Sequence, residues 1–242
     1  MIVVGTSGWQ YRDWRDVLYP EGLPQRRWLE RYADEFASVE VNNSFYRLPE
    51  IATFERWREG TPPDFTFAVK ASRFVTHIKR LRDAEDAVRL FVERAKGLGP
   101  KLGPILFQLP PRFPTDVGRL RSFLEWLPRG VRSAWEFRDP SWLADEILAT
   151  LDDAGCAFVL ADRPGFRGPM PVTGGWSYVR FHQGSRTGPD YRRDKLRRWA
   201  ERIADLPAED VWVYFNNDTG GAAIRDARFL RHALDQAQAR VA

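Results

Sequence analysis

Glu136 and Arg138 are the two residues whose types and spacing first indicate chemistry. They stand two positions apart in the stretch Trp135–Pro140, just before an Asp-Pro break. Side chains alternate between the two faces of a β-strand, so Trp135 and Phe137 point one way and the acid and the base point the other. A carboxylate and a guanidinium on one strand face are hard to explain as core. We interpret this stretch as the end of a strand that faces a polar cavity.

The same alternation places a polar or charged residue near the end of most other β-rich runs, on a shared face. The charged members of this set are Glu40, Lys70, Glu136, Arg138, Asp162, Arg180 and Asp218. Buried charges are costly unless they are paired or serve a site. The set is therefore either an interlocked salt-bridge network or a polar functional site. We favour the site, because seven charges are more than a core needs in order to pack.

Acid–base chemistry is the first role that this set could perform. Glu40 and Glu136 lie three strands apart, and two carboxylates among cations can hold different pKa values and divide the roles of acid and base. A Schiff-base role for Lys70 is the alternative, but its carboxylate and arginine neighbours do not obviously lower its pKa. The catalytic candidates are Glu40, Lys70, Glu136 and His182.

Anion binding is the second role, because Lys70, Arg138 and Arg180 converge on one end of the strands. The segment 216–221, Asn-Asn-Asp-Thr-Gly-Gly, leads into an expected helix N-terminus, whose free N–H groups favour anions. The same residue types also form simple turns and caps. With the three cations added, we favour an anion site.

Aromatic residues follow the first two strands and complete the predicted site. The rings of Trp9, Tyr11 and Tyr46 could stack on a sugar or a base, or could pack the loops together. The residues assigned to substrate binding are Ser7, Trp9, Asn42, Tyr46, Gln108, Arg138, Asp162, Arg180, Asn216, Asn217 and Asp218.

A divalent metal is the alternative occupant of this site. Its ligands would come from Glu40, Glu136, Asp162, Asp218 and His182. The three cations on the same face would repel a metal ion, so we predict neither a metal nor another cofactor.

Eight short β-rich runs alternate with segments of helical spacing. The runs are Ile2–Gly5, Ser38–Asn42, Thr66–Lys70, Pro104–Gln108, Ser133–Arg138, Ala157–Asp162, Ser177–His182 and Val211–Asn216. Strands that alternate with helices pair in parallel. Eight such units predict a single TIM-type (β/α)8 barrel over residues 1–242, an α/β fold whose active sites form at the C-terminal ends of the strands. The Pro- and Gly-rich stretch Arg163–Gly175 predicts an irregular loop in place of the sixth helix.

The composition is that of an ordinary globular protein, with 43% hydrophobic and 29% charged residues in a chain of 242. The single cysteine, Cys156, excludes an internal disulfide. No apolar run is long enough to span a bilayer, and the N-terminus lacks a signal pattern, so we expect a cytoplasmic protein without a membrane partner. The net charge of +4 permits nucleic-acid binding, but the basic run at 192–198 is better explained as a solvated helix face.

Several motifs taken together resemble one known family. They are Gly5-Thr-Ser-Gly-Trp9-Gln-Tyr11, Val39-Glu-Val-Asn-Asn-Ser-Phe-Tyr46, Phe67-Ala-Val-Lys70, the stretch Gly103–Phe113, Glu136-Phe-Arg138, Tyr178-Val-Arg-Phe-His182 and Tyr214-Phe-Asn-Asn-Asp218. Over essentially its whole length the chain is similar to the YecE-like proteins, the domain-of-unknown-function family 72. The resemblance implies a TIM barrel and supplies no reaction.

Two functions remain open from the sequence. The first is an enzyme that uses acid–base chemistry on a small anionic or phosphorylated substrate, as a hydrolase, a lyase or an isomerase. The second is a nucleic-acid-binding or endonuclease-like barrel that uses the same mouth and the basic helix, and a steep salt dependence of DNA affinity would favour it. No Rossmann or P-loop glycine pattern is present.

Overall fold

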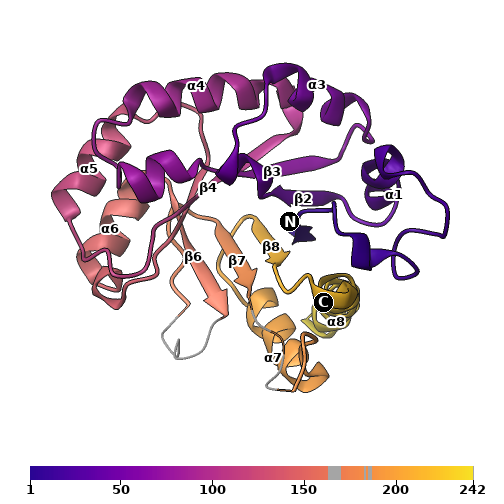
Figure 1. The fold of residues 1–242 in the computed structure, drawn as a ribbon. Coiled ribbons are helices and arrows are strands. Elements are labelled where there is room, and N and C mark those ends of the chain that lie inside the picture. The colour runs from indigo at the N-terminus through magenta and orange to yellow at the C-terminus, as the bar shows by residue number, and fades with distance from the viewer. Residues whose placement is uncertain (163–169, 183, 185–186, 242) are drawn as a thin grey trace.

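The computed structural model describes residues 1–162, 170–182, 184 and 187–241. Its strands run parallel and close into a barrel in sequence order, with β1 paired to both β2 and β8 (Figure 1). The strands are β1 (Ile2–Ser7), β2 (Ser38–Val41), β3 (Thr66–Lys70), β4 (Leu102–Gln108), β5 (Ser133–Glu136), β6 (Ala157–Asp162), β7 (Ser177–Phe181) and β8 (Val211–Phe215). The predicted TIM-type (β/α)8 barrel is confirmed.

Helices cover the outside of this barrel. They are α1 (Trp28–Ala33), α2 (Asn43–Tyr46), α3 (Ile51–Glu59), α4 (Glu85–Ala95), α5 (Val117–Trp126), α6 (Asp145–Asp153), α7 (Arg193–Ala204) and α8 (Ala222–Val241). Helices α3 to α6 follow one another around the strands, and α7 packs against α8 (Figure 1). Short 3₁₀ turns occur at Arg12–Trp14, Gln25–Arg27, Lys96–Lys101, Pro140–Trp142 and Thr219–Gly221, and a π-helical turn occurs at Phe74–Ile78.

Helix α4 illustrates why these segments are helical. Its buried residues Val88, Phe91, Val92 and Ala95 follow the three- and four-residue spacing of one helix face. Acidic residues occupy its first turn, where the positive end of the helix dipole stabilises them. One apolar stripe therefore fixes how the helix lies on the barrel.

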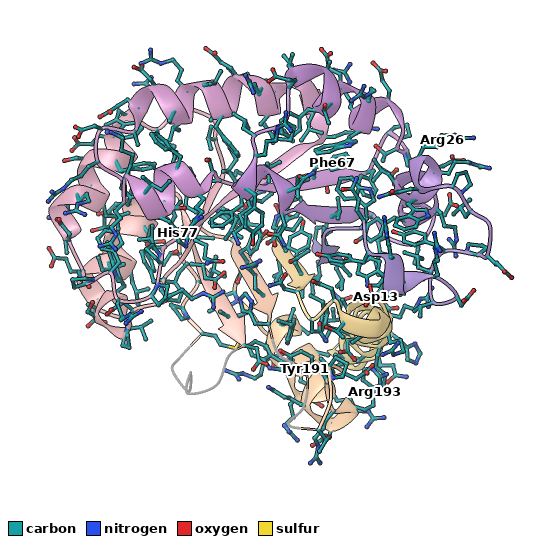
Figure 2. The ribbon with its side chains drawn as sticks, in the orientation of Figure 1. Asp13, Arg26, Phe67, His77, Tyr191 and Arg193 are labelled. Atoms are coloured by element: carbon teal, nitrogen blue, oxygen red, sulfur yellow. The ribbon has the colours of Figure 1, made fainter. Side chains whose placement is uncertain are left out.

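The strands separate two layers of apolar packing. The outer layer lies between strands and helices and contains large rings such as Phe67, labelled in Figure 2, Phe107 and Trp135. The inner layer fills the lumen with Val3, Ala68, Leu106, Ala134, Ala157, Val159, Trp176, Tyr178, Trp212 and Tyr214. Val3, Trp176 and Trp212 lie at or next to the N-terminal ends of their strands, whereas the charged residues Glu40, Glu136 and Arg180 lie toward the C-terminal ends.

The prediction of which side chains of the sixth strand face the lumen is wrong. Phe158 pairs in register with Trp135, and Asp162 pairs with Phe181, so all four lie on the face that meets the helices. The run from Ala157 to Ala161 is apolar throughout, so no polar residue shows which of its side chains face the lumen. Alternation therefore could not decide the direction. Asp162 therefore faces outward and pairs with Lys195 of α7, with Nζ and Oδ2 2.7 Å apart.

The connection between β6 and β7 is described only in part. Residues 170–176 contain no helix and include an isolated bridge between Thr173 and Trp176. The rest of the predicted loop Arg163–Gly175, residues 163–169, lies outside the described residues. Within the described part of the chain, no helix combines the length and the apolar character that a membrane span requires.

Candidate active site

Arg180 of β7 lies fully buried in the lumen between two carboxylates. Its Nη2 donates to Oε1 of Glu40 on β2 at 2.7 Å, and its Nη1 donates to Oε2 of Glu136 on β5 at 2.5 Å. All three side chains point inward, as the strand alternation predicted. A buried ion is tolerated only when it is paired and hydrogen-bonded, so this arrangement ties three strands together through charge.

Glu40 is surrounded by donors. Besides Arg180, the Ser7 hydroxyl donates to its Oε1 and the Tyr178 hydroxyl donates to its Oε2, each at 2.6 Å. Burial alone would raise the pKa of Glu40, but Arg180, Ser7 and Tyr178 outweigh burial and lower it. Burial and the nearby Glu40 carboxylate raise the pKa of Tyr178 well above its usual value. Glu40 is thus a permanently ionised acceptor rather than a free base.

Glu136 is enclosed by three cationic or imidazole groups. Its Oε1 lies 2.5 Å from Arg138 Nε and 3.2 Å from His182 Nε2. Burial acts to raise the pKa of Glu136, but Arg180, His182 and Arg138 hold it well below its ordinary value. Burial, together with Arg180 and Arg138, outweighs the opposing effect of Glu136 and lowers the pKa of His182. The centre therefore contains an ionised Glu136 and a neutral His182.

Lys70 is the one lumen cation that the network leaves outside. In the described part of the structure its ammonium makes neither an ion pair nor a hydrogen bond, and Nζ stands 4.4 Å from the centre of the Phe45 ring. Burial, followed by Arg180, lowers the pKa of Lys70 to about 8. This shift was not expected from the sequence, because strand alternation cannot show that arginines already hold both carboxylates.

The structure gathers most predicted site residues into one cluster. Gln108 Oε1 accepts from Arg180 at 3.3 Å, and Asn216 Nδ2 lies 3.4 Å from His182 Nδ1. The residues joined in this way are Ser7, Glu40, Asn42, Gln108, Glu136, Arg138, Arg180, His182 and Asn216, with Lys70 beside them. The salt-bridge network that the sequence left as an alternative is thus present, and among the described residues it accounts for every lumen cation except Lys70.

Five predicted site residues lie outside this cluster, and one of them, Asp218, is described below with the loop after β8. Asp162 faces the helices, and the buried Asn217 donates to the Pro189 carbonyl and to Asp226, each at 2.8 Å. Trp9 is buried against Trp57, with ring centres 5.1 Å apart. Tyr46 stands outside with 81% of its surface exposed. None of these four belongs to the charged centre, and Asp162 lies on the outer face of the barrel.

The loop after β8 is occupied by a carboxylate of the same chain. The Gly220 N–H donates to Oδ2 of Asp13 at 2.5 Å, although the two residues are 207 positions apart. Burial, with additional repulsion from Asp13 and Glu40, raises the pKa of Asp218 to about 6. Two acidic side chains therefore stand where the sequence suggested an anion, and the turn-and-cap interpretation fits this loop better.

Two residues outside the predicted site list also contribute to the site. Tyr178 was placed in the lumen by its strand alternation, and its phenol was the available signal for a partner of Glu40. His77 sits in the π-helical turn after β3 (labelled in Figure 2), with Nδ1 2.9 Å from the Thr76 hydroxyl. Burial and the neighbouring Lys70 lower its pKa to about 4, so this imidazole is neutral. No sequence signal separates it from an ordinary polar loop residue.

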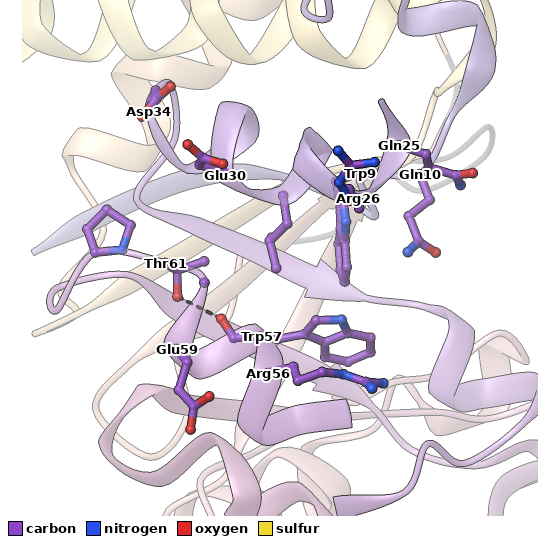
Figure 3. Close-up of a pocket in the computed structure, with 13 residues that line it drawn as sticks. Trp9, Gln10, Gln25, Arg26, Glu30, Asp34, Arg56, Trp57, Glu59 and Thr61 are labelled. Carbon is purple, nitrogen blue, oxygen red and sulfur yellow. Dashed lines mark hydrogen bonds between the residues drawn. The ribbon is translucent and has the colours of Figure 1, made fainter. Parts of the chain in front are cut away.

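Two hollows accompany the site. One of about 230 Å³ borders the charged cluster and is formed by the loop after β1 and the start of α2. A larger one of about 670 Å³ lies on the outside of the barrel between α1 and α3 (Figure 3). Arg26 and Arg56 stand at one end of it, and Glu30, Asp34 and Glu59 at the other (Figure 3). It is lined by exposed charges of both signs, so its size alone does not make it the active site.

Among the described residues, no group of three or more histidine, cysteine, aspartate or glutamate side chains is arranged to hold a metal ion. The carboxylate oxygens of Glu40 and Glu136 already contact Arg180, Ser7, Tyr178 and Arg138. The donor set of the centre is therefore ill suited to a metal, since cations already fill the positions that an ion would need.

Comparison with known proteins places this geometry in context. The family model described as "Protein of unknown function DUF72" matches residues 3–242. UPF0759 protein YunF of Bacillus subtilis (strain 168) is 28% identical over 272 residues, which covers 97% of this chain and 95% of that protein. UPF0759 protein YecE of Escherichia coli (strain K12) is 34% identical over 145 residues, covering 60% of this chain and 51% of that protein. The crystal structure of a DUF72 family protein from Thermotoga maritima MSB8 superimposes with a TM-score of 0.85 at 30% identity, covering 97% of this chain and 99% of that one.

Proposed function

The chain belongs to the DUF72 family of (β/α)8 barrels, and from the chemistry of its mouth we propose that it is an enzyme acting on a small anionic substrate. In this proposal the Lys70 ammonium binds the substrate's negative charge and donates a proton during the reaction. Arg180, Arg138, Glu40 and Glu136 form the fixed electrostatic frame around it.

The observation that carries the proposal is the unpaired ammonium of Lys70. Three cations, Lys70, Arg138 and Arg180, share the mouth with two ionised carboxylates, and the two arginines already engage both carboxylates. Because the neutral His182 adds no charge and the carboxylates are engaged by the arginines, the Lys70 ammonium is left without a partner among these groups. An anionic group of a substrate would balance it.

The lowered pKa of Lys70 suits it to proton transfer. A general acid works best when its pKa is close to the operating pH. An ordinary lysine holds its proton too tightly, with a pKa of about 10.4, whereas Lys70 titrates at about 8. The ammonium is thus charged when the substrate binds and can still release its proton near neutral pH.

The nucleic-acid alternative has less support. Its basic helix α7 is largely neutralised by its own chain, because Arg192 and Arg198 pair with Asp194 and Arg193 pairs with Asp226. Paired surface cations contribute little to binding and are screened by salt. No observed contact favours a duplex over a small anion.

Anion binding by wild-type protein and Lys70→Met tests the proposal. Sulfate, phosphate and sugar phosphates should raise the melting temperature of the wild type by mass action. Lys70→Met should weaken anion binding by about 10- to 100-fold, the worth of one charge-assisted hydrogen bond. The double variant Arg192→Ala with Arg197→Ala is the control and should leave anion binding intact. If the double variant lost binding and Lys70→Met kept it, the basic helix would be the binding surface and the nucleic-acid alternative would move ahead.

A further inference from the structure

The hollow of about 230 Å³ beside the charged cluster has a chemistry of its own. Its lining consists of Gly8, Trp9, Gln10, Tyr11, Asn42, Asn43 and Tyr46. None of these side chains is charged, and their polar groups are amides, phenols and an indole N–H. This composition contrasts with the centre, where the contacts are made mainly by carboxylates and guanidinium groups. The two regions therefore suit different parts of one ligand.

Direct contacts connect the hollow to the centre. Asn42 Nδ2 donates to Asn216 Oδ1 at 3.4 Å, and Asn216 lies next to His182. The Tyr11 hydroxyl donates to the Ser7 carbonyl at 2.7 Å, and Ser7 donates to Glu40. On the other side Tyr46 packs edge-on against Phe45, and the Lys70 ammonium lies over the Phe45 ring. The hollow therefore lies beside the residues that contact Glu40, His182 and Lys70.

Several groups in the hollow have unused binding capacity. Asn42 Oδ1 is buried without a hydrogen-bond partner among the described residues. Tyr46 is the most exposed of the large hydrophobic residues, at 81%, and its neighbour Asn43 is exposed as well. An amide offers both donors and an acceptor, and a hydroxyl group both donates and accepts. Amides beside an open aromatic face therefore match a ring that carries several hydroxyl groups.

We propose that this hollow holds a polyhydroxylated, sugar-like part of the anionic substrate, whose charged group rests on Lys70. The inference builds on the proposed function and narrows it to sugar phosphates or sugar acids. A nucleobase fits less well, because base pockets usually stack the base between two flat or apolar side chains. Only Tyr46 presents an open ring here, since Trp9 packs against Trp57 and Tyr11 packs against Trp14.

Calorimetric titration of inorganic phosphate, glucose 6-phosphate, ribose 5-phosphate and adenosine monophosphate tests the inference. At least one sugar phosphate should bind the wild type about tenfold more tightly than phosphate does, the gain from one to two added hydrogen bonds. Tyr46→Ala and Asn43→Ala should each remove most of that gain and leave the affinity for phosphate unchanged. Tyr46→Phe should retain the stacking contribution. Ile51→Ala, an exposed apolar residue outside the hollow, is the control and should have no effect.

The outcomes separate this inference from the proposed function. Equal affinity for phosphate and both sugar phosphates, or a gain that Tyr46→Ala does not reduce, would overturn the inference and leave the anion site standing. Tighter, Tyr46-dependent binding of adenosine monophosphate would replace the sugar with a base and overturn it as well. If no anion bound, saturation-transfer NMR with methyl glucoside would decide. A Tyr46-dependent signal would support the hollow while the anion site fails, and no signal would overturn both.

Discussion

The ammonium of Lys70 rests on the ring of Phe45 at 4.4 Å from its centre, and this contact replaces the ion pair that a buried lysine normally requires. A cation over an aromatic face gains some electrostatic stabilisation without losing its net charge. Lys70 is therefore held in place and remains available to an anion.

Sulfate affinity should fall as the pH rises through about 8, because the Lys70 ammonium loses its proton there. Sulfate keeps its charge across this range, so the pH dependence reports on the protein alone. Above that pH the affinity should drop about tenfold for each pH unit, as expected for loss of one required proton. Lys70→Arg keeps the charge at all these pH values and should flatten the profile between pH 7 and 9. A wild-type profile that is already flat would contradict the assignment of the anion to Lys70.

Replacing Arg180 with methionine should destabilise the fold by about 3–5 kcal/mol, because it removes the cation paired with the buried Glu40 and leaves Glu136 with Arg138 alone. Urea unfolding at pH 7 measures this loss. In the wild type the pKa values of Glu40 and Glu136 are depressed, so their stabilisation is present above the ordinary carboxyl pKa and is lost as the pH falls through the depressed values. In Arg180→Met burial should instead raise the pKa of Glu40, and the loss of stability relative to the wild type should become smaller as the pH is lowered to 5.

The triple variant Glu40→Gln, Glu136→Gln and Arg180→Met is the matched control for that experiment. It removes the two negative charges together with the cation, so part of the lost stability should return. If the triple variant were less stable than Arg180→Met alone at pH 7, uncompensated charge would not be the cause of the loss.

Asp218→Asn should stabilise the protein at pH 7.5 by about 1 kcal/mol, a figure reduced for the partial exposure of the side chain. The pKa of Asp218 is raised to about 6 by burial and by Asp13 and Glu40. A carboxyl whose pKa is higher in the folded state than in the unfolded state destabilises the protein increasingly as the pH rises from the unfolded-state pKa toward 6. Above pH 6 this destabilisation is constant. The gain should therefore be smaller at pH 5 than at pH 7.5 in thermal melts. A gain independent of pH would point to packing rather than charge.

Asp162→Asn should leave sulfate affinity unchanged, because Asp162 faces α7 and its partner is Lys195. Its effect on stability should stay within about 1 kcal/mol, as is usual for a partly exposed ion pair. Melting curves with and without sulfate measure both quantities. A clear change in sulfate affinity would mean that Asp162 acts at the mouth after all.

Strand alternation was enough to predict the barrel and most of its lumen. It placed Glu40, Lys70, Glu136 and Arg180 on one inner face, because each of those strands carries a polar residue that fixes the phase. It failed at β6, where Ala157 to Ala161 are all apolar and either face could turn inward. Small residues at 157, 159 and 161 were the remaining clue, since large rings from β7 and β8 already fill the lumen.

Pairing within the lumen could not be predicted in the same way. Alternation gives the direction of a side chain but not the strand whose side chain it meets across the barrel. Arg180 reaches Glu40 and Glu136, which are 140 and 44 positions away, and the choice depends on barrel closure and register. The same limit hid the contact of Asp13 with Gly220 and thus the occupied loop after β8.

The ion cluster around Arg180 also bears on how the chain folds. Its members come from β2, β5 and β7, so it is complete only when strands distant in sequence have met. Contacts of such long range form late, after the entropy of closing large loops has been lost. Interactions absent from the folding transition state govern the unfolding rate rather than the folding rate. The cluster therefore slows unfolding. Its loss in Arg180→Met should speed unfolding, while refolding keeps nearly its original rate.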